Sequence, residues 1–168
     1  MAVLTPRLVI RELTFADAPF IVTLLNDPAF ILNIGDRGVR TPEDACEYLT
    51  AGPLASYARH GFGLGAATLA ATGEPIGICG VLRRAELTEP DLGFAFLPQF
   101  RGQGYAFEAA SAVKADAHAR LGLATLLAIV NPVNTSSIRL LGKLGFAREG
   151  SVRLSGESID LYLFASRA

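Results

Sequence analysis

The chain contains 168 residues, of which 51% are hydrophobic and 18% are charged, so it can bury the core of one globular domain. Its 15 basic and 16 acidic side chains give a net charge of −1, which argues against a surface built to bind nucleic acid or an anionic membrane. No apolar run reaches the ~18 residues of a membrane-spanning helix, and Arg7, Arg11 and Glu12 lie where a signal peptide would be apolar. We therefore expect one cytoplasmic domain over residues 1–168, without nucleic-acid or membrane partners.

The cysteines and histidines offer little chemistry. Cys46 and Cys79 lie far apart and belong to no CxxC or Cys/His cluster, which argues against a disulfide scaffold or a structural zinc site. We therefore expect no bound metal. Without a paired histidine neither cysteine is a good nucleophile, so we expect both side chains in the core. His60 falls at a helix end and His118 on the polar side of a helix, where we expect solvated side chains.

Periodicity and turn residues predict elements in the order β-α-α-β-β-β-α-β-α-β-β. In chain order they are a strand over 7–13, a helix from Thr14 to about 27, a helix from Thr41 to about 52 continued over 53–60, strands over 62–71, 76–82 and 91–97, a helix over 103–121, a strand over 124–130, a helix over 135–144, and strands over 146–154 and 157–165. Thr14 and Thr41 are suited to start helices because an acid follows each of them three residues later. The pattern is that of a mixed α/β domain with a central βαβ unit.

A glycine-rich segment, Arg101-Gly102-Gln103-Gly104-Tyr105-Ala106, joins a strand to the longest predicted helix. The free N–H groups of a first helical turn point outward, the helix dipole adds positive charge, and glycines let a phosphate approach the backbone. Arg101 can add a charged fork for a phosphate oxygen. The segment therefore predicts an anion site.

Three interpretations of this segment compete. The glycines can serve only a tight turn between strand and helix. A dinucleotide-binding fingerprint would need three glycines in register and an acid about 20 residues further on, but the next strand ends at Val130-Asn131. A P-loop is excluded because no lysine follows Gly104.

The third interpretation is a resemblance to a known family. Residues 101–106 resemble the Arg/Gln-x-x-Gly-x-Gly/Ala signature of the acyl-coenzyme A site in the GNAT N-acetyltransferase superfamily. Residues 134–146 resemble the Asn-x-x-Ser…Lys-Leu-Gly-Phe helix of the branch that acetylates ribosomal-protein N-termini (RimJ/RimL-like), although they also suit a helix capped by Asn134 and Gly145. With the two chain ends included, the resemblance covers essentially the whole sequence.

This resemblance implies the GNAT acyl-CoA N-acyltransferase fold, an α/β fold with a mixed central sheet of about seven strands and about four helices. It implies an enzyme that moves the acetyl group of acetyl-CoA to a primary amine by direct attack in a ternary complex. The amine would belong to a protein N-terminus or to a small molecule, and the resemblance allows a homodimer. The alternative is a non-catalytic acyl-CoA-binding or sensing domain, and a nicotinamide-dinucleotide enzyme is a distant third.

The resemblance also assigns residues to the acetyl-CoA site. The amides of residues 101–106 would hold the pyrophosphate, the backbone N–H of Phe96 would polarise the thioester carbonyl, and Asn134 would hydrogen-bond the pantetheine arm. The complete set is Phe96, Leu97, Arg101, Gly102, Gln103, Gly104, Tyr105, Ala106 and Asn134.

Acetyl transfer also needs a proton for the departing thiolate. Many superfamily members supply it from a tyrosine four residues before the Gly-Phe pair, where this chain has Leu141. The resemblance to the RimL-like branch implies that the Ser137 hydroxyl takes this part. A serine at the start of a helix also has an ordinary structural explanation. The leucine at position 141 is what keeps the non-catalytic alternative open.

The proton released by the amine needs an acceptor. Asp91 shares one face of its predicted strand with the small residues Gly93 and Ala95, so it should face any groove that they leave open. We therefore expect Asp91 to be the general base, directly or through water. Glu89, of the same parity, and Glu86, in the preceding turn, are alternatives.

The loop over residues 33–40 lies between the first two predicted helices, where the family usually shapes its acceptor site. Asp36 could meet an ammonium group, and Arg37 or Arg40 a carboxylate or a cofactor phosphate. An ordinary surface loop with a local ion pair explains the same residues equally well.

Overall fold

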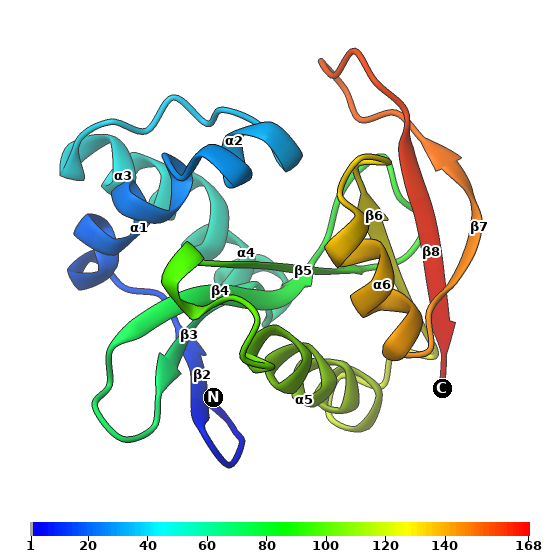
Figure 1. Ribbon diagram of the computed structural model, residues 1–168, viewed down its shortest axis with the longest axis horizontal. Helices are drawn as coiled ribbons and strands as arrows, with labels where there is room; N and C mark the ends of the chain where they lie inside the picture. Colours follow the sequence, from blue (N-terminus) through cyan, green and yellow to red (C-terminus); the bar gives the residue numbers. More distant parts are fainter. Residues whose placement is uncertain (1) are drawn as a thin grey trace.

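The computed structural model describes residues 2–168, in which eight strands form one sheet (Figure 1). The strands are β1 (Val3–Leu4), β2 (Leu8–Glu12), β3 (Leu64–Leu69), β4 (Pro75–Leu82), β5 (Asp91–Phe96), β6 (Thr125–Val130), β7 (Ala147–Val152) and β8 (Leu161–Arg167). Their order is β1-β2-β3-β4-β5-β6-β8-β7. Neighbouring strands are antiparallel except β5 and β6, which are parallel.

Helices cover both faces of this sheet. They are α1 (Ala18–Leu25), α2 (Pro28–Asn33), α3 (Pro42–Leu49), α4 (Ala55–His60), α5 (Tyr105–Ala119) and α6 (Thr135–Lys143). Figure 1 shows α1 to α4 on one side of β4 and β5, and α5 on the other. Within residues 2–168, no helix is both long and apolar enough to span a bilayer.

Two apolar clusters hold these layers together. On one face, α5 presents a row of small buried residues to the sheet, and Leu141 of α6 and Leu144, just after that helix, join the same cluster. On the other face, α1 and α3 bury leucines and isoleucine, among them Ile21, Leu24 and Leu49. The sheet is therefore buried on both faces, as the mixed α/β pattern predicts.

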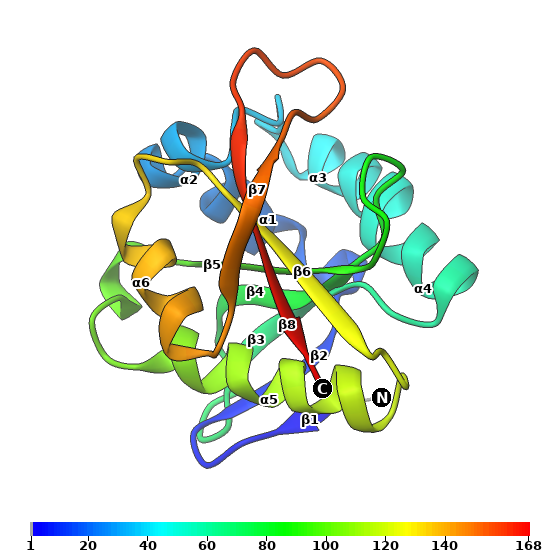
Figure 2. The same ribbon diagram turned by 90° about the vertical axis from the view of Figure 1, so that its right-hand side faces the viewer.

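The sheet divides between β5 and β6. These two strands pair only at Asp91 and Leu127, where the Leu127 N–H donates to the carbonyl of Pro90 at 2.9 Å. Beyond this point β6 runs obliquely to β5 (Figure 2) and pairs along its whole length with β8 instead. The backbone groups of β5 that face β6 after Asp91 therefore have no strand partner, and the sheet opens there.

The predicted α/β fold is confirmed, with three corrections. The two-residue β1 is an eighth strand, too short to show a period in the sequence. A helix was missed at Pro28–Asn33: Asp27 follows the end of α1 and then caps α2, accepting a hydrogen bond from the Phe30 N–H at 3.2 Å. The predicted helix from Thr41 to His60 is interrupted by a π-helical turn at Thr50–Leu54, which contains Pro53.

The predictions for cysteine and histidine are partly confirmed. Cys79 is fully buried, which raises its pKa to about 12, and Cys46 is half-buried against the apolar cluster of α1 and α3. His60 is exposed as expected. The expectation for His118 is wrong: its Nδ1 lies 2.6 Å from the Leu123 carbonyl, and its Nε2 is buried without a hydrogen bond in the described chain.

Candidate active site

The glycine-rich segment forms the turn between β5 and α5. Gly102 and Gly104 have φ of 73° and 83°, a left-handed conformation that glycine adopts without strain. The first helical hydrogen bond of α5 runs from the Glu108 N–H to the Gly104 carbonyl at 3.0 Å. The amides of residues 105–107 therefore have no acceptor within the helix, and the predicted set of free donors is present.

The chain before β2 holds this turn in place. Arg7 donates from Nη1 to the Gln103 carbonyl at 2.9 Å and from Nε to Glu108 Oε2 at 2.6 Å. The Thr5 hydroxyl donates to the other Glu108 oxygen at 2.6 Å. Burial alone would raise the pKa of Glu108, but the hydrogen bonds from Thr5 and Arg7 outweigh it and lower that pKa. The turn is thus fixed by a charged cluster that lies about a hundred residues away in the sequence.

Arg101 also makes a contact that the sequence did not predict. Its Nη2 lies 2.5 Å from Asp27 Oδ2, so the guanidinium ties the turn to the start of α2, and the side chain remains in the wall of a cavity beside the turn. Asp27 is only 8% exposed, and a buried carboxylate requires a cationic partner. The partner comes from a helix that the sequence analysis missed.

A cavity of about 780 Å³, here called the loop cavity, extends from the glycine turn between α2, β5 and α6. Seven of the nine residues predicted for acetyl-CoA line it: Phe96, Arg101, Gly102, Gly104, Tyr105, Ala106 and Asn134. The other two, Leu97 and Gln103, do not. Leu97 packs into the core, and the Gln103 side chain donates to the Gln99 carbonyl at 3.0 Å.

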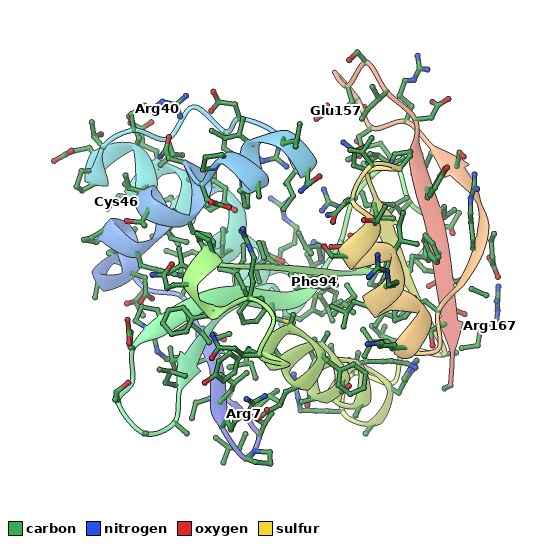
Figure 3. The ribbon with its side chains drawn as sticks, in the orientation of Figure 1. Arg7, Arg40, Cys46, Phe94, Glu157 and Arg167 are labelled. Atoms are coloured by element: carbon green, nitrogen blue, oxygen red, sulfur yellow. The ribbon has the colours of Figure 1, made fainter. Side chains whose placement is uncertain are left out.

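The open edge of β5 faces this cavity. The Leu97 N–H donates to Ile76 of β4 at 2.9 Å. Because amides alternate in direction along a strand, those of Phe96 and Phe94 face the other way, toward the gap left by β6. Phe94 lies at the centre of the molecule (Figure 3). The sequence analysis missed Phe94 because its pattern shows only a strand residue on the α5 face.

The start of α6 lies across this gap. Asn134 caps the helix, its Oδ1 accepting from the Ser137 N–H at 3.3 Å. The Ser137 hydroxyl makes no hydrogen bond within residues 2–168. Ser137 lines the loop cavity and also a second cavity beside the point where β5 and β6 separate. Leu141 is 1% exposed and apolar, so it can deliver no proton. Among these three residues, Ser137 alone presents a free hydroxyl.

Asp91 lies where β5 and β6 separate, in the wall of a second cavity of about 320 Å³, here called the splay cavity. It is 1% exposed, and both carboxylate oxygens lie 3.1 Å from Arg84 Nε. Burial raises the pKa of Asp91, and the Arg84 charge offsets part of that rise. Gly93 and Ala95 line an open cavity as predicted, whereas the Asp91 carboxylate is turned against Arg84.

Three other acids lie near the end of β5 where Asp91 stands or in the wall of its cavity. Glu86 accepts from the Ser155 N–H at 3.1 Å, and neither it nor Glu89 lines the splay cavity. Glu157, on the loop between β7 and β8, does line it (Figure 3). It was missed because nothing in the sequence places that loop over β5.

A third cavity of about 410 Å³, here called the helix pocket, lies between helices α2 to α4 and strands β3 to β5. Ile34 and Phe94 line all three cavities. The splay cavity and the helix pocket also share Arg37, Arg84 and Gly93. One path therefore runs from the glycine turn, past the open edge of β5, to the helix pocket.

The sequence that forms this arrangement matches a known family. The family model of the Acetyltransferase (GNAT) domain matches residues 7–147. The chain belongs to the GNAT acetyltransferase family. The GNAT domain includes the glycine turn, the opening between β5 and β6 and the start of α6.

Individual relatives agree with this family. The chain is 28% identical over 150 residues to the uncharacterized N-acetyltransferase YoaA of Bacillus subtilis, covering 89% of this chain and 84% of YoaA. It is 34% identical over 99 residues to the uncharacterized N-acetyltransferase p20 of Bacillus licheniformis, a match that spans 56% of each protein. The prediction of an acetyltransferase is thus confirmed at the level of the family.

Solved acetyltransferase structures share the whole fold. An acetyltransferase from Agrobacterium tumefaciens superposes with a TM-score of 0.85 at 27% identity, over 100% of this chain and 95% of that one. RimL, the ribosomal L7/L12 alpha-N-protein acetyltransferase, solved in complex with coenzyme A, superposes with a TM-score of 0.81 at 15% identity, over 99% and 98%. At that identity the second likeness is one of fold.

Proposed function

We propose that this protein transfers the acetyl group of acetyl-CoA to a primary amine by direct attack in a ternary complex. The observation that carries the proposal is the path through the sheet: one end is a cluster of free amides, the middle is an open strand edge, and the far end is a separate pocket. Two substrates entering from opposite ends would meet at Phe94 and Ser137.

The loop cavity fits acetyl-CoA in its donors. The free amides at the start of α5 suit the pyrophosphate, because they are neutral donors at the positive end of a helix dipole. The unpaired amides on the open edge of β5 suit the amide groups of the pantetheine arm, as an added strand would pair there. Asn134 lies in the opposite wall of this cavity. When bound, acetyl-CoA would supply the acetyl group as a thioester.

The chain's own residues would assist at three atoms. The Phe96 N–H, with Phe94 as its neighbour on the same edge, would donate to the carbonyl oxygen on which negative charge develops. Ser137 would donate a hydrogen bond to the departing sulfur. Asp91 would accept the proton lost by the amine, through water, and its burial favours that role because it raises the pKa of the carboxyl.

The choice of branch is part of the proposal. The Asn134-to-Phe146 segment resembles the branch that acetylates ribosomal-protein N-termini, and the fold-level likeness to RimL is compatible with it. The buried Leu141 favours the alternative of an acyl-CoA-binding domain without turnover, since it removes the usual acidic hydroxyl. Separate measurements of acetyl-CoA binding and of turnover distinguish the enzyme from the binding domain.

The first experiment is a calorimetric titration with acetyl-CoA, with NAD as the control ligand. The chain should bind acetyl-CoA and not NAD, and Gly104→Asp should abolish binding because it places a carboxylate beside the pyrophosphate site. Gly73→Asp is the matched control: Gly73 also has a positive φ, 78°, and lies in the open turn between β3 and β4. Equal loss in both variants, or no binding by the folded wild-type protein, would contradict the proposal.

The second experiment measures coenzyme A release with a panel of amines. Ser137→Ala and Asp91→Asn should lower kcat and leave the affinity for acetyl-CoA nearly unchanged. Ser151→Ala is the matched control for the first, since Ser151 lies on β7, is exposed and lines none of the three cavities. Tight binding without thiol release from any amine would favour the sensing domain, and unchanged rates in both variants would remove these two assignments.

A further inference from the structure

We propose that the acceptor amine is a small molecule that carries an anionic group, a carboxylate or a phosphate, on an apolar body, and that the helix pocket holds this group. This inference rests on the proposed function and names the substrate class of the same site. It is carried by the juxtaposition of several arginines with apolar walls at the acceptor end of the path.

The charge of the helix pocket is one-sided. Four arginines and one histidine line it, and none of its lining residues in the described chain is acidic: Arg37, Arg59, His60, Arg83 and Arg84. The whole chain, by contrast, has a net charge of −1. The pocket therefore concentrates positive charge in a protein that has no excess of it, and low-dielectric walls strengthen such a local potential.

Most of this charge is uncompensated. Arg84 is neutralised by Asp91. Arg37, Arg59 and Arg83 form no ion pair with any residue in 2–168, and the Arg83 Nη1 bonds only to carbonyls, among them Thr88 at 3.1 Å. A guanidinium presents a planar pair of donors that matches a carboxylate or a phosphate, so these side chains are suited to recognise an anion.

A neutral donor accompanies the arginines. The Tyr48 side chain lines the same pocket, and its hydroxyl makes no hydrogen bond within the described residues. Burial raises the pKa of Tyr48, and the nearby charges of Arg37 and Arg84 offset part of that rise. Tyr48 is therefore a protonated phenol that can donate to a ligand.

Most of the remaining lining residues are apolar. Phe30, Leu64 and Ile78 face the pocket, Phe94 of β5 borders it, and the π-helical turn at Thr50–Leu54 closes one side of it. A volume of about 410 Å³ suits a small molecule more than a folded protein surface. The combination excludes a polyamine as the preferred acceptor, since its several ammonium groups would meet like charge.

The path gives such an acceptor its direction. The pocket shares Gly93 and Phe94 with the splay cavity, where the open strand edge and Ser137 lie. An anion held by Arg37 and Arg59 would leave the amine end of the molecule pointing toward Phe94. Positive potential around the amine also lowers the pKa of its ammonium form, which favours the neutral nucleophile.

The test compares matched amines. Coenzyme A release would be measured with apolar α-amino acids and ω-amino acids, each beside its own carboxamide, and with O-phosphoethanolamine, spermidine and a serine-initiated peptide. We expect kcat/KM to favour a carboxylated or phosphorylated amine over its neutral analogue by about tenfold or more. The ammonium group of an α-amino carboxamide has a lower pKa than that of the matching amino acid, so more of the carboxamide is the neutral nucleophile. For those pairs the comparison is therefore biased against the proposal. The phosphate arm shows which anion is preferred.

Variants assign the effect to the pocket. Arg37→Ala and Arg59→Ala should each raise KM for the anionic amine about tenfold and leave KM for its neutral analogue within about twofold. Arg167→Ala is the control: Arg167 lies on β8, is exposed, pairs with Glu149 and is remote from Phe94 (Figure 3). The same variants would be titrated calorimetrically with the anionic amine in the presence of coenzyme A, so that binding is read without turnover.

The outcomes separate the two proposals. Turnover that is fastest with spermidine or with the peptide would overturn the substrate class while supporting acetyl transfer. Equal losses for anionic and neutral amines in the arginine variants would do the same. If no amine is acetylated, the proposed function fails, and the calorimetric arm still decides the pocket: binding of an anionic amine that Arg37→Ala and Arg59→Ala weaken supports it, and no binding overturns it.

Discussion

The ion pair between Arg84 and Asp91 offers the sharpest test of the structure. Asp91 is 1% exposed, and Arg84 Nε is its side-chain partner in the described chain. Arg84→Met keeps the length of the aliphatic stem and leaves a buried carboxylate without a cation. Breaking a buried pair in this way costs about 3–5 kcal/mol, and we expect about 3 kcal/mol because the Arg84 side chain is 26% exposed.

The pH dependence gives this prediction a sign. Burial already raises the pKa of Asp91, and loss of the Arg84 charge raises it further. A carboxyl whose folded pKa lies above its unfolded value costs no stability below the unfolded pKa, and the cost grows as the pH rises until it is complete above the folded pKa. The cost of Arg84→Met should therefore be complete at pH 8 and shrink as the pH falls toward 5.

Thermal and urea unfolding at pH 8 and pH 5 would measure this cost. For a chain of this length, about 3 kcal/mol corresponds to a fall in Tm of about 6–12 °C. Adding Asp91→Asn to Arg84→Met should recover most of the loss, since an amide has no charge to bury. A cost below about 1 kcal/mol at pH 8, a cost independent of pH, or no recovery in the double variant would refute the reasoning.

Three further predictions test the site and its support. Glu108→Gln removes the charge that holds Arg7 at the glycine turn, so it should weaken acetyl-CoA binding, measured by calorimetry, and lower the free energy of unfolding by about 1 kcal/mol. Because the folded protein lowers the pKa of Glu108, the wild-type carboxylate stabilises the fold above its unfolded pKa and loses this contribution on acidification. The difference in stability between wild type and variant should therefore be present at pH 7 and reduced at pH 3. Gly93→Val places a Cβ 2.7 Å from Leu82 Cδ1 in the wall of the helix pocket. The KM for the acceptor should therefore rise about tenfold or more, while the Kd for acetyl-CoA, measured by calorimetry, stays the same. Tyr57→Phe removes a half-buried hydroxyl that accepts from one backbone amide and donates to one carbonyl, and urea unfolding should show a loss of about 1–2 kcal/mol, with unchanged kinetics.

Much of the fold could be predicted because its signals are local. The start of α3 is a capping box formed by Thr41 and Asp44, three residues apart, and it lies where the sequence predicts it. The α2 helix was missed for a local reason as well. The pair Asp27-Pro28 can end one helix or start the next, and here it starts α2, because α1 already ends at Leu25.

The sequence could predict only those parts of the site whose residues are contiguous in the chain. The glycine turn carries its own evidence in six consecutive residues, so its free amides were predictable. The partner of Arg101, by contrast, is 74 residues away, and the arginines of the helix pocket come from three separate segments. Their convergence depends on the separation of β5 from β6 and on the packing of α2 to α4, which no single stretch of sequence encodes.

Two buried carboxylates lie at the two places in the fold on which the path between the cavities depends. Of the acids that are buried, Asp27 lies beside the glycine turn and Asp91 at the point where β5 and β6 separate. Each is paired with an arginine, Arg101 and Arg84, and buried ion pairs rarely add stability over apolar packing. We therefore infer that these ion pairs serve to fix the positions of the elements that they join. If β5 had stayed paired with β6 past Asp91, the Phe94 and Phe96 amides would be hydrogen-bonded within the sheet and could not bind a ligand. By this argument Arg84→Met should disturb the acceptor end of the path and Arg101→Ala the acetyl-CoA end, which separate changes in the two KM values would reveal.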